Sequence, residues 1–184
     1  MATADELLIS RAIADNDTKA FNELVQRHQS RVRGWLRHLA GDAALADDLA
    51  QDTFLKAWRK LATYNATGSF EGWLLRIARN EFLQSRRKSG REAGHLERLE
   101  SEVQSDSDSS ELPKHHGEGS DSDRFLEILG PDERDIMILV YGIGLSHAEA
   151  SHVSGLALGT VKSHVRRSVL KIREQFDLDG LNND

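Results

Sequence analysis

The stretch Leu158–Phe176, LGTVKSHVRRSVLKIREQF, predicts a helix with one apolar stripe and one basic face. At about 100° per residue, six apolar side chains fall within an arc of roughly 80°. These are Leu158, Val161, Val165, Val169, Ile172 and Phe176. The cations outside the arc are Lys162, Arg166, Arg167, Lys171 and Arg173, with Ser163 and His164 among them. Such a helix suits a surface of phosphates, although a solvated helix in an ordinary bundle has the same pattern.

The residues before this helix predict a second, shorter one. Ser146 and Glu149 have the spacing of a capping box, in which each side chain accepts a hydrogen bond from the other residue's backbone N–H. Ser154 and Gly155 then supply a turn. Helix, tight turn and basic helix together have the length of a helix-turn-helix, the motif that lays its second helix in the major groove of DNA. We therefore expect this part of the chain to bind DNA.

Composition and length limit the remaining possibilities. The chain has 184 residues, 39% hydrophobic and 29% charged, which allows one domain or two small ones. It has no apolar run of membrane-spanning length, and its first residues, MATADELLISRAIADN, lack the features of a signal peptide. The absence of cysteine excludes disulfides and thiolate metal sites. We expect a cytoplasmic protein without membrane insertion.

The net charge of −6 is distributed unevenly along the chain. Residues 89–122 hold nine acidic and three basic residues and are rich in Ser and Gly. Such a segment cannot bury enough apolar surface to fold alone. We therefore predict an all-α protein of two small helical domains, residues 1–90 and 123–184, joined by a flexible acidic linker over residues 91–122. The linker is either a solubilising spacer or an acidic segment that occupies a basic groove on a partner.

The first domain is predicted to be helical throughout, because its apolar residues recur at three and four positions. One long helix begins at Asp17 or Thr18 and ends at Gly41, with His28 packed on its apolar stripe. A second helix covers about residues 42–61. Its buried residues are predicted to be Ala46, Ala50, Phe54, Ala57 and Leu61. Its other side is either solvent surface or a docking face, formed by Asp48, Gln51, Asp52, Leu55 and Arg59.

A loop and a helix ending at Lys88 combine aromatic rings with cations. The rings are Tyr64, Phe70 and Trp73, and the polar side chains are Arg76, Arg79, Asn80, Arg86, Arg87 and Lys88. Single-stranded DNA binds such surfaces, because each base that stacks on a ring contributes roughly 1–3 kcal/mol and the cations hold the backbone. The alternative is that the rings belong to the core and the terminal cations only favour the helix dipole.

Four blocks of sequence follow one another in the chain: AFNELVQRHQSRV, DDLAQDTFLKAWRKL, FEGWLLRIARNEFLQSRRK and LGPDERDIMILVYGIGLSHAEASHVSGLALGTVKSHVRRSVLKIRE. Their order and spacing resemble the bacterial extracytoplasmic-function sigma factors, the smallest class of RNA polymerase specificity subunits. The resemblance covers nearly all of both predicted domains and misses only the acidic linker and the two ends of the chain. It implies an alternative sigma factor that binds core RNA polymerase, recognises the −10 and −35 elements of promoter DNA, and initiates transcription of a restricted regulon. It also implies an anti-sigma factor as a partner.

The resemblance further implies three sets of contact residues. The polymerase-binding set is Asp48, Gln51, Asp52, Leu55 and Trp58. The −10 set, which would capture a flipped base as DNA melts, is Tyr64, Asn65, Ser69, Phe70, Trp73, Arg76, Arg79, Asn80, Arg86 and Arg87. The −35 set is Thr160, Lys162, Ser163, His164, Arg166, Arg167 and Lys171. Ser151 and Ser154 stand where the family is usually less polar, which predicts looser packing of the first helix of the motif.

No catalytic motif is present in the sequence. It lacks a glycine-rich phosphate loop and a nucleophile elbow. His147 and His152 would lie on roughly opposite sides of a helix, and His115 and His116 have no further ligand types nearby. We therefore expect no enzyme activity, no cofactor and no metal site. The alternative function is a stand-alone helix-turn-helix transcription regulator, in which the cationic and aromatic residues 64–88 would have no purpose.

Overall fold

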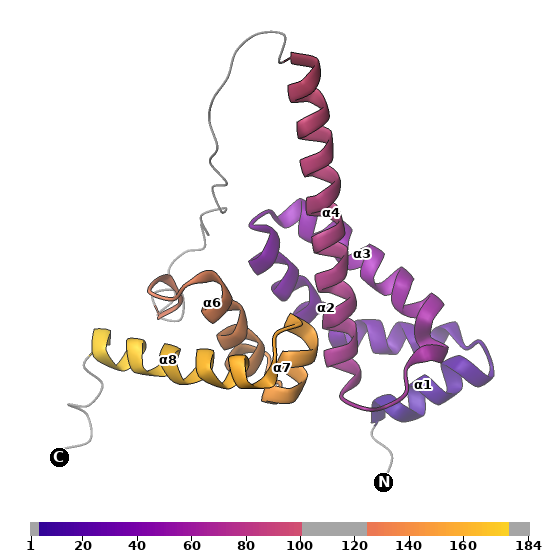
Figure 1. The fold of residues 1–184 in the computed structure, drawn as a ribbon. Coiled ribbons are helices and arrows are strands. Elements are labelled where there is room, and N and C mark those ends of the chain that lie inside the picture. Colours follow the sequence, from indigo (N-terminus) through magenta and orange to yellow (C-terminus); the bar gives the residue numbers. More distant parts are fainter. Residues whose placement is uncertain (1–3, 101–124, 177–184) are drawn as a thin grey trace, which may run out of the picture. The chain divides into compact units, whose positions relative to one another are not determined.

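The computed structural model describes residues 4–100 and 125–176, without the side chains of residues 91–100 and of residue 176, and every element in these ranges is a helix (Figure 1). The predicted all-helical fold is confirmed. In chain order the elements are α1 (Ala4–Ala14), α2 (Thr18–Ala40), α3 (Ala43–Lys60), the 3₁₀ turn η1 (Leu61–Thr63), α4 (Phe70–Glu100), α6 (Pro131–Met137), the π-helical turn η2 (Ile138–Gly142), α7 (His147–Ser154) and α8 (Leu158–Phe176).

Contacts between Cα atoms divide the chain into two units. The first unit consists of Met1–Asn65 and Ile77–His115, and the second of Ala66–Arg76 and His116–Asp184. The domain boundaries expected near residues 90 and 122 therefore stay predictions, with most of the acidic linker outside the described residues.

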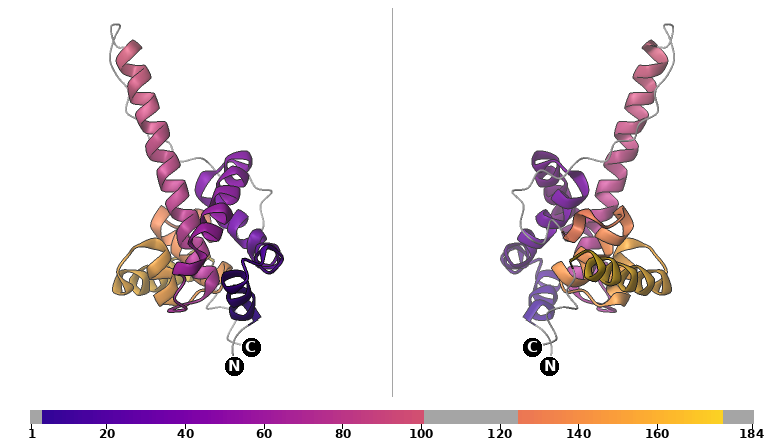
Figure 2. Two further views of the ribbon diagram at one scale, coloured as in Figure 1. Left: turned by 90° about the vertical axis from the view of Figure 1, so that its right-hand side faces the viewer. Right: turned by 90° about the vertical axis from the view of Figure 1, so that its left-hand side faces the viewer.

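Helix α4 is longer than its sequence suggested. We expected it to end at Lys88, but it continues through Gly90 to Glu100. Its last turns lie beyond the ends of α2 and α3 (Figure 2). The Arg-Arg-Lys run at residues 86–88 therefore lies within a helix, so the negative end of the helix dipole does not explain these cations.

The first unit is built on a hairpin of α2 and α3, whose ends are capped as the sequence predicts. The Asp17 carboxylate accepts from the backbone N–H groups of Lys19 and Ala20 at 2.9 and 3.1 Å. Gly41 ends α2 in the left-handed region, at φ 66°, where a side chain would be strained. Asp42 then caps α3. These caps fix the turn and bring the apolar sides of the two helices together.

Helix α1, which the sequence analysis did not assign, packs against α2. Leu8, Ile9 and Ala12 are buried in this contact. The Asp5 carboxylate lies 2.7 Å from Nε2 of the buried His28. The prediction that His28 is a packed residue is confirmed, and its carboxylate partner was missed because it lies 23 residues away in the sequence.

The second unit contains the predicted helix-turn-helix. The Ser146 and Glu149 capping box opens α7, and Gly155 ends it at φ 74°. The hydroxyl of Ser151 donates to the Leu156 carbonyl at 2.6 Å, and the Ser154 hydroxyl accepts from the Leu156 N–H at 3.3 Å. These two serines, expected to loosen the packing, thus form hydrogen bonds that shape the turn.

The apolar stripe of α8 is rotated from the predicted position. Val161 and Val165 are buried as expected, but Leu158 is 41% exposed. Ser168, which the stripe omitted, is completely buried. The buried side is therefore centred closer to Ser168 than the apolar residues alone suggest. The cause is that α8 packs against α6 as well as α7.

Candidate nucleic-acid and polymerase interfaces

The outward side of α8 gathers four residues of the predicted −35 set. They line an open hollow of about 810 Å³ together with Ala157, Gly159 and Leu170. The four are Thr160, Ser163, Arg166 and Arg167. Within the described part of the chain, Arg166 forms no ion pair, so its guanidinium is available to a ligand. This side can offer hydroxyl groups and two guanidinium groups to one partner.

The other three residues of the −35 set lie on the flanks of α8. Lys162 and Lys171 are about 180° apart around the helix axis. His164 is half-buried, and its Nδ1 lies 3.3 Å from Nη2 of Arg167. The structure therefore separates the predicted set into an outward row and two flanks.

The flank of α8 that carries Lys171 contacts a buried carboxylate that was not predicted from the sequence. Glu133 of α6 is 7% exposed, and its Oε2 accepts from Nζ of Lys171 at 2.6 Å. Its Oε1 lies 3.9 Å from Nε of Arg167. The same carboxylate accepts from the Gly130 N–H at 3.2 Å, which caps α6. The hydrogen bond from Lys171 is the largest cause that holds the pKa of Glu133 below its usual value, so the ion pair persists at neutral pH.

A sequence signal for Glu133 did exist. A glycine and a proline precede it, and a glutamate at the third position of a helix that begins with proline is a helix-start pattern. The pattern predicts the cap on Gly130. It does not predict the contact with Lys171, which lies 38 residues further along the chain.

The residues of the −10 set lie on α4 and on the loop before it. The Ser69 hydroxyl accepts from the Gly72 N–H at 3.1 Å at the start of α4. The rings of Phe70 and Trp73 stack with centroids 5.5 Å apart. Phe70 is buried, whereas Trp73 and Tyr64 are half-buried. Of the three rings, Tyr64 and Trp73 therefore offer more surface to a partner.

The polar members of the −10 set follow α4 along its length. Arg76, Asn80 and Arg87 fall within about 40° of one another around the helix. Asn80 and Arg87 line a small hollow of about 160 Å³ with Lys56 and Lys60 of α3. These two lysines were not among the residues predicted from the sequence to bind DNA. Arg79 is half-buried, while Asn65 and Arg86 are exposed.

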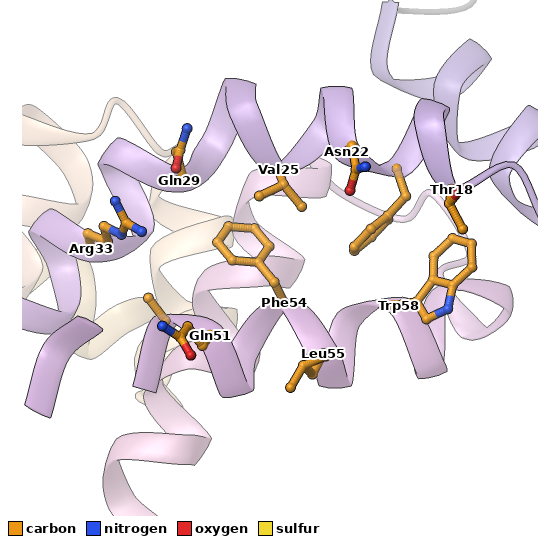
Figure 3. Close-up of a pocket in the computed structure, with 11 residues that line it drawn as sticks. Thr18, Asn22, Val25, Gln29, Arg33, Gln51, Phe54, Leu55 and Trp58 are labelled. Carbon is orange, nitrogen blue, oxygen red and sulfur yellow. The ribbon is translucent and has the colours of Figure 1, made fainter. Parts of the chain in front are cut away.

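The polymerase-binding set forms a ridge between two hollows. Gln51, Leu55 and Trp58 line a groove of about 450 Å³ between α2 and α3, which run antiparallel (Figure 3). Asp48 and Asp52 instead line a separate hollow of about 580 Å³ between α3 and α4. The side of the ridge that faces α2 is thus apolar and aromatic, and the side that faces α4 carries the two aspartates.

The groove between α2 and α3 has an apolar floor. Val25 of α2 points toward Phe54 of α3 (Figure 3). The rings of Phe21 and Trp58 meet with centroids 4.9 Å apart. Phe54, which was predicted to be buried, is half-buried because the helices leave this groove open beside it. Leu55 is 56% exposed at its edge.

Among the residues that the structure describes, no three side chains of His, Asp or Glu gather in a way that would hold a metal ion. Within the same residues, none of the helices has the length and apolar character needed to span a bilayer.

The two units therefore present a capped helix-turn-helix with a cationic outer side, and a helical hairpin beside a long cationic helix. Together these define a transcription protein that binds DNA. Comparison with known proteins identifies the family. The Sigma-70 region 2 model matches residues 24–92, and the Sigma-70, region 4 model matches residues 125–174.

Curated relatives support the same assignment. The chain is 31% identical to RNA polymerase sigma factor NccH of Alcaligenes xylosoxydans xylosoxydans, over 92% of this chain and 93% of the relative. It is 32% identical to ECF RNA polymerase sigma factor EcfG of Rhodopseudomonas palustris, over 81% of each. A 34% identity to ECF RNA polymerase sigma factor SigE of Mycolicibacterium smegmatis covers 84% of this chain and 61% of that relative.

Two solved structures are also similar to this one. The sigma factor RpoE from Bartonella quintana, in complex with the anti-sigma factor NepR, aligns with a TM-score of 0.64 at 30% identity, over 88% of this chain and 99% of that one. CnrH, in complex with the cytosolic domain of CnrY, aligns with a TM-score of 0.63 at 25% identity, over 96% and 99%.

The chain belongs to the extracytoplasmic-function sigma factors of RNA polymerase. The resemblance stated from sequence is confirmed, and a stand-alone regulator is the less favoured alternative. As an alternative sigma factor, the chain binds core RNA polymerase and recognises promoter DNA.

Proposed function

We propose that promoter recognition is divided between two parts of the chain: α8 reads the −35 element, and the loop and helix around Trp73 engage the −10 element. The observation that carries this proposal is the outward side of α8, where two hydroxyl groups and two guanidinium groups line one open hollow behind a capped turn. In a helix-turn-helix the second helix lies in the major groove, where such side chains can contact base edges.

On α8, the outward residues are suited to different contacts. Arg166 and Arg167 can each donate two hydrogen bonds to the O6 and N7 acceptors of a guanine, and Ser163 can bond to several bases. Lys162 on the flank is placed to contact a phosphate, which would add affinity without sequence preference. The base contacts would make binding sequence-specific, and the phosphate contact would add affinity for any sequence.

At the −10 element, the half-buried rings of Tyr64 and Trp73 can stack with unpaired bases, while Arg76, Asn80 and Arg87 follow the strand. Promoter opening would then draw on binding free energy, and the chain itself would need no nucleotide hydrolysis, cofactor or enzyme activity. The promoters that the chain would recognise lie on the bacterial chromosome, so the chain would act in the cytoplasm.

The ridge of α3 is our proposed docking site for core polymerase. Asp48 and Asp52 lie one turn apart and can meet basic side chains, while Leu55 and Trp58 can pack into an apolar surface. Two solved relatives are complexes with an anti-sigma factor or with a cytosolic domain. We therefore also propose that an anti-sigma factor restrains this chain by covering the same ridge.

The experiment is transcription by holoenzyme reconstituted from core RNA polymerase and the purified full-length chain. Arg166→Ala should lower transcription from a promoter selected by the wild-type holoenzyme, and should matter less when the −35 element of that promoter is scrambled. Replacing both Asp48 and Asp52 with lysine should abolish co-purification with core enzyme, because like charges placed at an interface cost several kcal/mol. A wild-type chain that binds DNA but does not join core polymerase would favour the stand-alone regulator.

A further inference from the structure

The buried Glu133 connects the start of α6 to the reading helix. Its carboxylate accepts at once from the Gly130 N–H and from Lys171, and Arg167 lies within ion-pair distance. A carboxylate on a surface that meets phosphates weakens DNA binding by charge repulsion. Glu133 therefore lowers the positive potential of the DNA-binding unit, and its presence calls for another role.

Lys171 is fixed on the α6 side of α8. Its side chain is 46% exposed, but its ammonium group points to a carboxylate that is only 9% exposed. To contact a phosphate, Lys171 would have to leave Glu133. Because the Glu133 carboxylate is buried, the departure of Lys171 would leave a buried charge with less compensation, which is costly. The contact with Glu133 is therefore the stable position of this lysine.

The opposite flank of α8 provides a natural contrast. Lys162 lies about 180° from Lys171 around the helix and is exposed, and within the described residues it forms no ion pair. The two lysines belong to the same helix and carry the same charge. They differ in that one of them is neutralised by a neighbouring helix.

We propose that Glu133 is a positioning residue for −35 recognition: through Lys171, and with Arg167 beside it, its carboxylate sets the orientation of α8 in the major groove. Lys171 acts through this contact and does not bind a phosphate. The inference rests on the proposed −35 role of α8. It removes Lys171 from the set of residues that contact DNA, and it gives Glu133, a residue of opposite charge, a role in positioning α8.

The test compares binding to two duplexes. Wild-type holoenzyme, assembled from the full chain and core RNA polymerase, selects one duplex from a pool randomised upstream of the start site. The second duplex has the selected upstream element scrambled. The measured quantity is the ratio of the two affinities across a range of salt concentrations. Glu133→Gln keeps the shape of the side chain and an acceptor for Gly130, and Lys171→Met keeps the packing of the stem.

Positioning predicts that both variants reduce the ratio by about tenfold, within the range of couplings between side chains in contact. The double variant should lose no more than either single one. Lys171→Arg should retain the ratio, because the guanidinium group can still reach the carboxylate. The matched control, Lys162→Met, should leave the ratio unchanged and lower the salt slope by about 1, as the loss of one phosphate contact does.

A phosphate-binding Lys171 predicts the opposite pattern. Lys171→Met would then lower the salt slope by about 1 at an unchanged ratio, and Glu133→Gln would strengthen binding to both duplexes equally. Either result would overturn the inference while leaving the −35 role of α8 intact. A wild-type holoenzyme that selects no sequence would instead contradict the proposed function, and the inference with it. If Glu133→Gln fails to fold, the Met and Arg variants of the exposed Lys171 decide the question.

Discussion

Both units of the chain bury a glutamate that binds a lysine of another helix, but the two glutamates are placed differently. In the first unit Glu81 of α4 meets Lys56 of α3 at 2.6 Å, and Lys56 also donates to Gln84 at 3.3 Å. In the second unit Glu133 meets Lys171 at 2.6 Å but also caps its own helix. Glu81 thus joins two helix interiors, whereas Glu133 joins a helix start to another helix.

The amount of local structure that depends on one carboxylate therefore differs between the two sites. A mid-helix glutamate can be lost with all the backbone hydrogen bonds of its helix intact. A capping glutamate also satisfies a backbone N–H group that has no partner within the helix. The second unit should therefore depend more strongly on Glu133 than the first unit depends on its Lys56 contact.

The largest effect is expected from Glu133→Ala. The change removes a cap, worth about 1 kcal/mol, and a hydrogen bond to a charged group, worth about 1.5–3 kcal/mol where it is buried. Because Lys171 is partly exposed, we expect a total loss of about 2 kcal/mol. Hydrogen exchange of the α6 and α8 amides measures it, and unchanged protection of both helices would contradict the capping role. The amides of α2 serve as the internal control.

A smaller effect is expected from Lys56→Met in the first unit. The variant keeps most of the apolar stem and leaves Glu81 buried without its cation, which should cost about 1 kcal/mol after solvent screening. Exchange at the α3 and α4 amides should increase, while the affinity ratio between the selected and scrambled −35 duplexes should not change. A loss of that ratio in Lys56→Met would show that the two contacts are not independent.

Acid titration tests the role of the Glu133 charge in the wild-type chain. The pKa of Glu133 is held below the usual value of a glutamate, chiefly by the hydrogen bond from Lys171. A lowered pKa in the folded state contributes stability above the unfolded pKa, and this contribution is lost as pH falls through the folded value. The α6 and α8 amides should therefore lose protection below about pH 4.5. In Glu133→Gln the protection of these amides should depend less on pH. An acid profile identical to that of the wild type would contradict the role assigned to the Glu133 charge.

The expected acid effect is smaller than that of Glu133→Ala. A protonated Glu133 still fills its site and can still accept from the Gly130 N–H. Only the charge that holds Lys171 and Arg167 is lost. The difference between the two experiments therefore separates two contributions of Glu133 to stability: the helix cap and the ion pair.

Much of this structure could be predicted from local sequence. Caps such as Asp17 and Ser146 act within three residues of their targets, so their pattern is visible in the chain itself. The helix-turn-helix and the cationic side of α8 follow from spacing and periodicity for the same reason. The polar residues that line the hollow on the outward side of α8 all belong to the predicted −35 set, whose contacts with DNA stay a prediction.

Contacts between distant residues could not be predicted in this way. Asp5 with His28, Lys56 with Glu81, and Glu133 with Lys171 join residues that are 23, 25 and 38 positions apart. No periodicity links such pairs, because their meeting depends on how whole helices pack. For the same reason the sequence placed Lys171 with the other cations, although its environment separates it from them.

The smallest predicted effect concerns Ser168, which the apolar stripe of α8 omitted. Its side chain is completely buried, and within the described residues its Oγ has no hydrogen-bond partner. A buried hydroxyl without a partner costs about 1–3 kcal/mol relative to water, whereas a methyl group at the same position carries no such cost. Alanine is also a better helix former than serine. We therefore expect Ser168→Ala to stabilise the second unit by up to about 1 kcal/mol, offset in part by the small cavity that the lost oxygen leaves. The measurement is hydrogen exchange of the α8 amides, with Ser163→Ala as the matched control on the exposed side of the same helix. If Ser168→Ala weakens protection of α8 while Ser163→Ala does not, the hydroxyl does have a partner, such as a bound water, and the buried side of α8 is more polar than its neighbours indicate.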